Sequence, residues 1–100
     1  MTDSENGDLV ASGYIIVGLR RGVCATAGRR LRDVLQGFTC AATLENEAGA
    51  IARVHVLLDT LLLEVSTGER IRLRCQGPEA PAAFRALASV LEGREEVENA

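Results

Sequence analysis

The stretch that decides the fold is Val17-Gly18-Leu19-Arg20-Arg21-Gly22-Val23-Cys24-Ala25. An apolar run ends here, a loop with two arginines follows, and apolar residues at helical spacing begin. A strand that leads into a helix in this way presents backbone N–H groups at the helix start, where anions bind readily. Small domains often place a phosphate or an active group at such a junction.

The chain has 100 residues, which is the size of one ordinary domain. Its hydrophobic content is 47% with only 3% aromatic residues, so the core is expected to consist of Leu, Val, Ile and Ala. Residues 1–8 are polar and lack periodicity, which predicts a disordered N-terminal segment. We therefore expect one folded domain over residues 9–93 and an acidic tail over residues 94–100.

The net charge of −3 argues against nucleic acid as a partner held by bulk electrostatics. The charge is unevenly spread, because residues 18–32 contain five arginines and no acid. Local anion binding therefore remains open.

The three cysteines, Cys24, Cys40 and Cys75, form no Cys-x-x-Cys pair. An odd number without metal-ligand spacing favours free thiols in a reducing compartment over a disulfide framework or a zinc site. The acidic start of the chain is not a secretory signal, and no apolar run reaches the ~20 residues of a membrane-spanning helix. We expect a cytoplasmic protein without metal or cofactor and without membrane contact.

Periodicity predicts seven elements in the order βαββαβα. Residues 69–76 alternate strictly, with Ile71, Leu73 and Cys75 inward and three arginines outward, which indicates a sheet with one face in water. The predicted fold is therefore α+β, a four-stranded antiparallel sheet with three helices on one face. The expected strands are residues 9–17, 38–45, 50–54 and 69–76, and the expected helices are residues 23–36, 55–65 and 79–92.

Each predicted helix has an apolar stripe that should face the sheet. In the middle helix this stripe leaves Val56, Leu62 and Leu63 at the edges or outside. The expected inward residues are Cys24, Ala27, Leu31, Val34 and Leu35 in the first helix, Val54, Leu57, Leu58, Leu61 and Val65 around the second, and Ala80, Phe84, Leu87, Ala88 and Leu91 in the third.

The element order and residues 10–93 resemble the histidine-containing phosphocarrier (HPr) family of the bacterial sugar phosphotransferase system, which is an open-faced β-sandwich. The family signature is Gly-[Leu/Ile]-His-Ala-Arg-Pro-Ala at the start of the first helix. Gly18 and Leu19 match it, and the five residues that follow do not. Residues 63–77 and 80–93 follow the family pattern of helix end, turn, alternating strand and closing helix without a gap.

The resemblance also marks three departures at functional positions. Arg20 stands at the position of the phosphoacceptor histidine, and Gly22 at that of the motif arginine that helps to hold the phosphoryl group. The regulatory serine of the family aligns near Val56. A guanidinium group is always protonated and is no nucleophile, so this chain cannot use the family's reaction through the family's residue.

Three residues or pairs are candidates for chemistry. Arg20 and Arg21 precede a helix N-terminus and could bind a phosphate, a carboxylate or a phosphorylated partner, or they could be a solvated loop. Cys24 lies in the first helical turn and could be a reactive thiol or a core residue. His55, the single histidine, could be a displaced phosphoacceptor or an ordinary surface residue.

Val56, Leu62 and Leu63 are interface candidates, because partners of the resembled family dock on its first two helices. Neighbouring loops could cover these residues instead, and self-association through them is an equally simple outcome. Arg70, Arg72 and Arg74 are interpreted as an ordinary wet sheet face rather than as a site.

Three functions remain open, and the first two belong to different classes. The first is a regulatory or protein–protein interaction module on the phosphocarrier scaffold that has lost phosphotransfer and is not an enzyme. The second is a genuine phosphocarrier that uses another acceptor residue. The third is a self-assembling structural subunit. If the protein is such a regulatory module, its expected partner is a phosphorylated or acidic protein. Nucleic acid is not expected as a partner.

Overall fold

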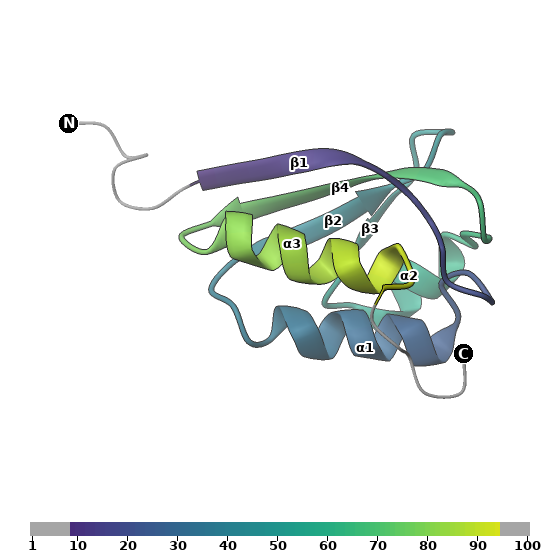
Figure 1. The fold of residues 1–100 in the computed structure, drawn as a ribbon, viewed down its shortest axis with the longest axis horizontal. Coiled ribbons are helices and arrows are strands. Elements are labelled where there is room, and N and C mark those ends of the chain that lie inside the picture. The colour runs from purple at the N-terminus through teal and green to yellow at the C-terminus, as the bar shows by residue number, and fades with distance from the viewer. Residues whose placement is uncertain (1–8, 95–100) are drawn as a thin grey trace.

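The chain forms four strands and three helices in the predicted order βαββαβα (Figure 1). The computed structural model describes residues 9–94, so the expectations for residues 1–8 and for most of the acidic tail lie outside the described residues. The elements are β1 (Leu9–Ile16), α1 (Ala25–Leu35), β2 (Ala41–Glu45), β3 (Ile51–Arg53), α2 (Leu57–Leu62), β4 (Arg70–Gly77) and α3 (Ala80–Leu91).

The strands form one antiparallel sheet in the order β1-β4-β2-β3. The first and last strands of the sequence thus become neighbours, with Leu9 opposite Gly77 and Ile16 opposite Arg70. β2 and β3 form a hairpin in which the Asn46 side chain accepts a hydrogen bond from the Ala50 N–H at 2.9 Å. This order makes β1 one edge of the sheet and β3 the other.

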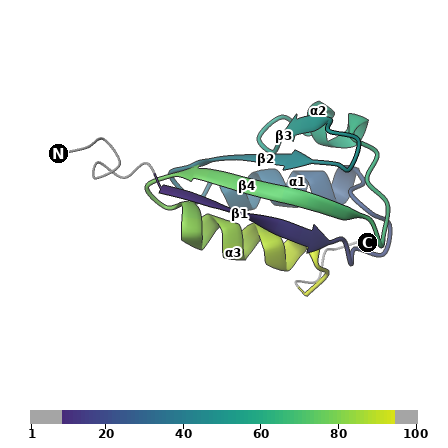
Figure 2. The same cartoon turned by 90° about the horizontal axis from the view of Figure 1, so that it is seen from above.

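All three helices lie on one face of the sheet, as predicted. α1 and α3 lie along the strands, and α2 is a short helix beside β3 (Figures 1 and 2). The other face carries exposed side chains from every strand, including Tyr14, Ile16 and the three arginines of β4. The α+β open-faced sandwich expected from the sequence is confirmed.

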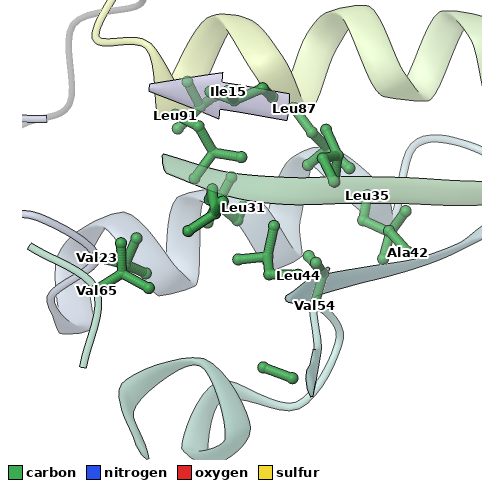
Figure 3. Packing of buried hydrophobic residues seen from close by; sticks show 14 of the residues in the cluster. Ile15, Val23, Leu31, Leu35, Ala42, Leu44, Val54, Val65, Leu87 and Leu91 are labelled. Carbon is green, nitrogen blue, oxygen red and sulfur yellow. The ribbon is translucent and has the colours of Figure 1, made fainter. Parts of the chain in front are cut away.

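The core lies between the sheet and the helices and is built from aliphatic side chains, as the composition predicts (Figure 3). Ile71, Leu73 and Cys75 of β4 are fully buried, which confirms the alternation predicted for that strand. Leu31 and Leu35 from α1 and Leu87 and Leu91 from α3 pack against it. Burial of aliphatic side chains contributes about 1.5–3 kcal/mol each relative to exposure, so this layer holds the sheet and helices together.

The first helix begins later than predicted and packs more closely on its neighbour. It starts at Ala25, and Cys24 and Val34 are only partly buried. Gly28 is buried because it faces α2: a Cβ atom there would lie 2.7 Å from Leu57 Cδ1. The glycine therefore permits the close approach of α1 and α2. In α3 the prediction holds for Ala80, Leu87 and Leu91, while Phe84 and Ala88 are partly buried and Ala83 and Val90 are fully buried.

The middle helix differs most from the prediction. It spans only Leu57–Leu62, because Glu64 takes a left-handed conformation with φ 55° and turns the chain back toward the core. As a result Leu63 is buried at 9% exposure, whereas Leu58 is 63% exposed. The expected inward position of Leu58 and the expected outward position of Leu63 are both wrong.

Two predicted strands are shorter than expected. Phe38, Thr39 and Cys40 form bends, and β2 begins only at Ala41. The returning strand is limited to Ile51–Arg53, and Val54 and His55 form a turn. Phe38 and Cys40 still pack partly against the core, although neither belongs to the strand.

Candidate functional site

The loop between β1 and α1 is fixed by backbone hydrogen bonds to two segments that come much later in the sequence. The Val17 N–H donates to the Glu69 carbonyl at 2.9 Å, and the Gly68 N–H donates back to the Val17 carbonyl at 2.8 Å. The Gly18 N–H donates to the Leu91 carbonyl at the end of α3. The loop is therefore set by contacts that are distant in sequence.

Arg20 and Arg21 form an exposed turn at the start of this loop. The turn is closed by a hydrogen bond from the Gly22 N–H to the Leu19 carbonyl at 3.0 Å. The Thr67 hydroxyl donates to the carbonyl groups of Leu19 and Arg20 and so ties the turn to the loop before β4. Within residues 9–94 neither arginine side chain has a hydrogen bond or an ion pair. Both guanidinium groups are thus available to an external anion.

Gly22 occupies a position that excludes a side chain. Its φ is +66°, which L-residues adopt only with strain, and a Cβ atom would lie 2.2 Å from the Val65 carbonyl oxygen. That carbonyl also accepts a hydrogen bond from the Val23 N–H at 3.0 Å, so it is held in place. This is the position at which the resemblance expects the arginine that holds a phosphoryl group.

Cys24 is the residue immediately before α1. Its side chain does not cap the helix, and its carbonyl accepts the Gly28 N–H at 2.8 Å. The thiol is free and partly buried against the core, while the first turn of α1 contains no acidic side chain. Its partial burial is typical of a core residue, and its place before a helix without acidic side chains in the first turn is typical of a reactive thiol. A reactive Cys24 therefore stays a prediction.

His55 and Val56 lie at the start of α2, in a different loop from the arginine turn. His55 is exposed in the turn that follows β3, and Val56 is the N-cap residue of α2. Since Val56 carries no hydroxyl group, the helix start offers no phosphorylatable serine at the aligned position.

An ion pair joins β3 to α2, and sequence reasoning did not identify it. The Asp59 carboxylate accepts hydrogen bonds from Arg53 Nε at 2.7 Å and from the Arg53 backbone N–H at 3.2 Å. The side-chain bond from Arg53 is the main cause that lowers the pKa of Asp59 below its ordinary value, and the His55 charge adds to it slightly. An acidic residue in the first turn of a helix was the available signal.

The exposed apolar surface of α2 consists of Leu58 and Leu62, which are 63% and 69% exposed. They are four residues apart and so lie on the same side of the helix. Val56 is partly buried, and Leu63 belongs to the core. Of the three predicted interface residues the structure therefore leaves Leu62 fully available, Val56 in part and Leu63 not at all.

The thiols of Cys40 and Cys75 are close enough for each to influence the pKa of the other. Burial is the largest cause that raises the pKa of Cys75 to about 12, and it also raises the pKa of Cys40. A thiol that stays protonated is a poor nucleophile, so this pair has the properties of structural cysteines. Residues 9–94 contain no group of three or more histidine, cysteine, aspartate or glutamate side chains placed to hold a metal ion.

A shallow hollow of about 310 Å³ lies on the open face of the sheet near the β2–β3 hairpin. The Arg70 guanidinium lies 4.6 Å from the centre of the Tyr14 ring, and its Nε is 3.4 Å from a Glu47 carboxylate oxygen. Because Arg70 is already engaged by these two neighbours, the hollow has the character of a solvated sheet face. Its lining comprises Tyr14, Glu45, Asn46, Glu47, Gly49, Arg70 and Arg72.

The element order and the open-faced sheet define a protein with the phosphocarrier fold. The model of the family described as "PTS HPr component phosphorylation site" matches residues 12–93, and the chain belongs to this family. The resemblance noted in the sequence is thereby confirmed. Within residues 9–94 no helix is long and apolar enough to cross a membrane.

Comparison with known proteins gives particular relatives. The chain is 26% identical over 69 residues to the phosphocarrier protein NPr of Escherichia coli K12, which covers 69% of this chain and 77% of NPr. The structure resembles phosphocarrier protein HPr from Bacillus anthracis, with a TM-score of 0.78 and 20% identity over 84% of this chain and 99% of that one. It also resembles Crh of Bacillus subtilis, described as a swapped dimer, with a TM-score of 0.67 and 28% identity over 81% of this chain and 90% of that one.

Proposed function

We propose that this member of the HPr family has lost phosphotransfer through its first helix and acts as a regulatory binding module for a protein partner. The proposal depends on the arginine turn, because that is where the resemblance places the reacting histidine. Arg20 occupies the position, and a guanidinium group cannot accept a phosphoryl group as a neutral imidazole can.

The observation that carries the proposal is the conformation of Gly22. A phosphoryl group needs cationic donors beside the acceptor, and the family supplies an arginine at this position. Here a side chain would collide with the Val65 backbone at 2.2 Å, so the loop is shaped around its absence. The change therefore involves the backbone of the loop as well as the single residue at position 20.

His55 is the remaining candidate for a genuine phosphocarrier, and its surroundings do not favour that role. The neighbouring Arg53 is engaged by Asp59, with Nε at 2.7 Å from the carboxylate, and so it does not offer a free guanidinium. The Asp59 carboxylate interacts electrostatically with His55 and would repel a phosphoryl group placed there.

The arginine turn and the exposed leucines of α2 supply the chemistry for binding a protein. Arg20 and Arg21 offer cations that have no partner among residues 9–94, and Leu58 and Leu62 offer exposed apolar surface. An acidic or phosphorylated protein of the phosphotransferase system would match the two cations by forming bidentate hydrogen bonds. We propose this class of partner and a cytoplasmic location for the complex.

The loss of phosphotransfer can be tested by intact mass. The protein is incubated with phosphoenolpyruvate and the first enzyme of the phosphotransferase system, with the B. anthracis HPr as a positive control. We expect a phosphoryl adduct on the control and none on this chain. An adduct that disappears in His55→Ala would replace the proposal with the genuine phosphocarrier.

Binding through the arginine turn needs a separate test. An immobilised acidic phosphopeptide is titrated with the wild type, with Arg20→Ala/Arg21→Ala, and with Arg72→Ala/Arg74→Ala as a control of equal charge on the open sheet face. We expect the first variant to lose most of the binding and the second to retain it. Equal binding by both variants would remove the turn from the proposal.

Self-association is a second candidate function, and the Crh relative favours it. That protein was described as an intertwined dimer formed by swapping, so the scaffold tolerates exchange of elements between copies. Such assembly and partner binding by the arginine turn use different surfaces and do not exclude each other.

A further inference from the structure

The first strand leaves one side of its backbone without a partner. β1 is an edge of the sheet, because β4 is its single neighbour and no other described strand pairs with it. Its sequence over Leu9–Ile16 is LVASGYII, which has no charged residue and no proline. Exposed edges with these properties are templates for pairing with another chain.

The two edges of this sheet differ sharply. β3 has three residues, carries Arg53 and is packed against α2, and each of these features discourages pairing. β1 has eight residues in continuous register with β4 from Leu9 to Ile16, with no bulge to twist it away. The protection found at β3 is thus missing at β1.

β1 also holds most of the exposed apolar surface of the sheet. Of the seven large hydrophobic side chains exposed in residues 9–94, four belong to this strand. Val10, Tyr14 and Ile16 lie on the open face and are 52%, 65% and 57% exposed. A neighbouring strand would cover part of each of them.

The hydrogen bonds of Val17 show which backbone groups point outward. Both its N–H and its carbonyl bond to the segment leading into β4, through Glu69 and Gly68. In an antiparallel strand the direction alternates from one residue to the next. The N–H and carbonyl groups of Val10, Ser12, Tyr14 and Ile16 therefore point away from β4, toward the free edge.

We propose that β1 pairs antiparallel with β1 of a second copy of this chain, joining two sheets into one. This inference rests on the self-association candidate and assigns it a surface. Centring the two-fold axis on Gly13 places Val10 opposite Ile16 and Ser12 opposite Tyr14 of the other copy. This register satisfies the outward groups of all four residues, whereas a shift by two residues leaves some unpaired.

A second copy fits this edge better than a charged partner does. An isologous interface brings the same surface of both copies together, and a strand without charges suffers no repulsion when it pairs with a copy of itself. Across the axis the apolar Val10 and Ile16 cover each other. On the inner face Phe84 lies beneath Gly13, with its Cζ 3.3 Å from a Cβ built there, so the two phenyl rings would approach each other at the axis.

The oligomeric state of the full chain tests the proposal. Sedimentation equilibrium over a range of concentrations is expected to show a reversible dimer. Tyr14→Lys places a charge on the edge and should raise the dimer dissociation constant by about tenfold or more. Ile51→Lys is the matched control, because Ile51 is 63% exposed on the opposite edge strand, and it should leave dissociation unchanged.

Amide hydrogen exchange locates the interface. We expect the amides of Val10, Ser12, Tyr14 and Ile16 to become protected as the concentration rises. Ser12→Pro removes one outward donor while leaving the bonds to β4 intact, and should weaken the dimer. A dimer in which these amides still exchange freely would form in another way, for example by strand swapping or through Leu58 and Leu62. That result overturns the proposed β1 interface but leaves self-association standing. A monomer at all concentrations overturns both, and the phosphorylation assay is unaffected by either result.

Discussion

Gly22 and Val65 are in such close contact that a Cβ atom on the glycine would lie 2.2 Å from the valine carbonyl oxygen. The contact joins the arginine turn to the chain that leaves α2, and the Val23 N–H bonds to the same carbonyl. The conformation of the turn thus depends on where residues 63–67 run. A loop built in this way has no room for a side chain at position 22.

Gly22→Ala should therefore be more destabilising than a glycine substitution that introduces strain alone. We expect a loss of about 3 kcal/mol or more, because the left-handed backbone and the collision with a fixed carbonyl act together. Gly49→Ala is the matched control, since Gly49 has φ +91° and no atom within 4 Å of its Cβ position. It should cost only about 1–2 kcal/mol. Urea denaturation measures both, and equal losses would show that the contact with Val65 is relaxed in solution.

Leu62 and Leu63 are adjacent in sequence but should respond differently to truncation. Leu63→Ala removes a side chain that is 9% exposed and should cost about 2–3 kcal/mol. Leu62→Ala alters a side chain that is 69% exposed and should change stability by less than about 0.5 kcal/mol. Thermal or urea unfolding measures the stability of the two variants. A longer, regular α2 would bury different leucines, so equal losses in the two variants would contradict the structure.

The Arg53–Asp59 pair predicts a low titration midpoint for Asp59. The pKa of its carboxyl is lowered mainly by the Arg53 side chain and then by the Arg53 backbone N–H. A depressed pKa contributes stability that is present above the ordinary value of about 3.9 and is lost as the pH falls through the lower folded value. NMR titration of the Asp59 side-chain carboxyl should show this shift. In Arg53→Gln the midpoint should rise but stay below the ordinary value, because the backbone bond remains.

The raised pKa of the Cys75 thiol predicts a loss of stability at alkaline pH. Its pKa is raised to about 12, so the folded protein keeps a proton that the unfolded chain releases near pH 8.5. Stability from this group is complete below the unfolded pKa and falls as the pH rises toward 12, by at most about 1.4 kcal/mol per pH unit. Unfolding free energies between pH 8 and 10.5 should decline less steeply in Cys75→Ala. Identical slopes in the two proteins would place the thiol in a wetter environment.

The parts of the fold with strict periodicity were predictable from sequence. β4 alternates without exception, and the turns at Gly68 and Gly77 mark its ends, so its bounds were placed to within a residue. α2 was not predictable in the same way because eight of the twelve residues from Val54 to Val65 are apolar and they fall on every side of a helix. Spacing cannot choose a buried face in such a run, and the left-handed Glu64 that ends the helix carries no local signal.

The candidate site also contains one part that the sequence predicts and one part that it does not. The position of Arg20 and Arg21 ahead of α1 follows from the end of one periodic segment and the start of another. The role of Gly22 does not, because its conformation is imposed by Val65 and by the bonds of Thr67 to the turn. Contacts between distant segments leave no trace in a local pattern.

The pairing of β1 with β4 has a consequence during synthesis. Of the described strands β1 is synthesised first, and its single described neighbour, residues 70–77, is synthesised last. Until then its uncharged backbone has no native partner, and contacts of such long sequence separation form slowly. The nascent chain is therefore most prone to premature association through the same eight residues that form the free edge of the finished sheet.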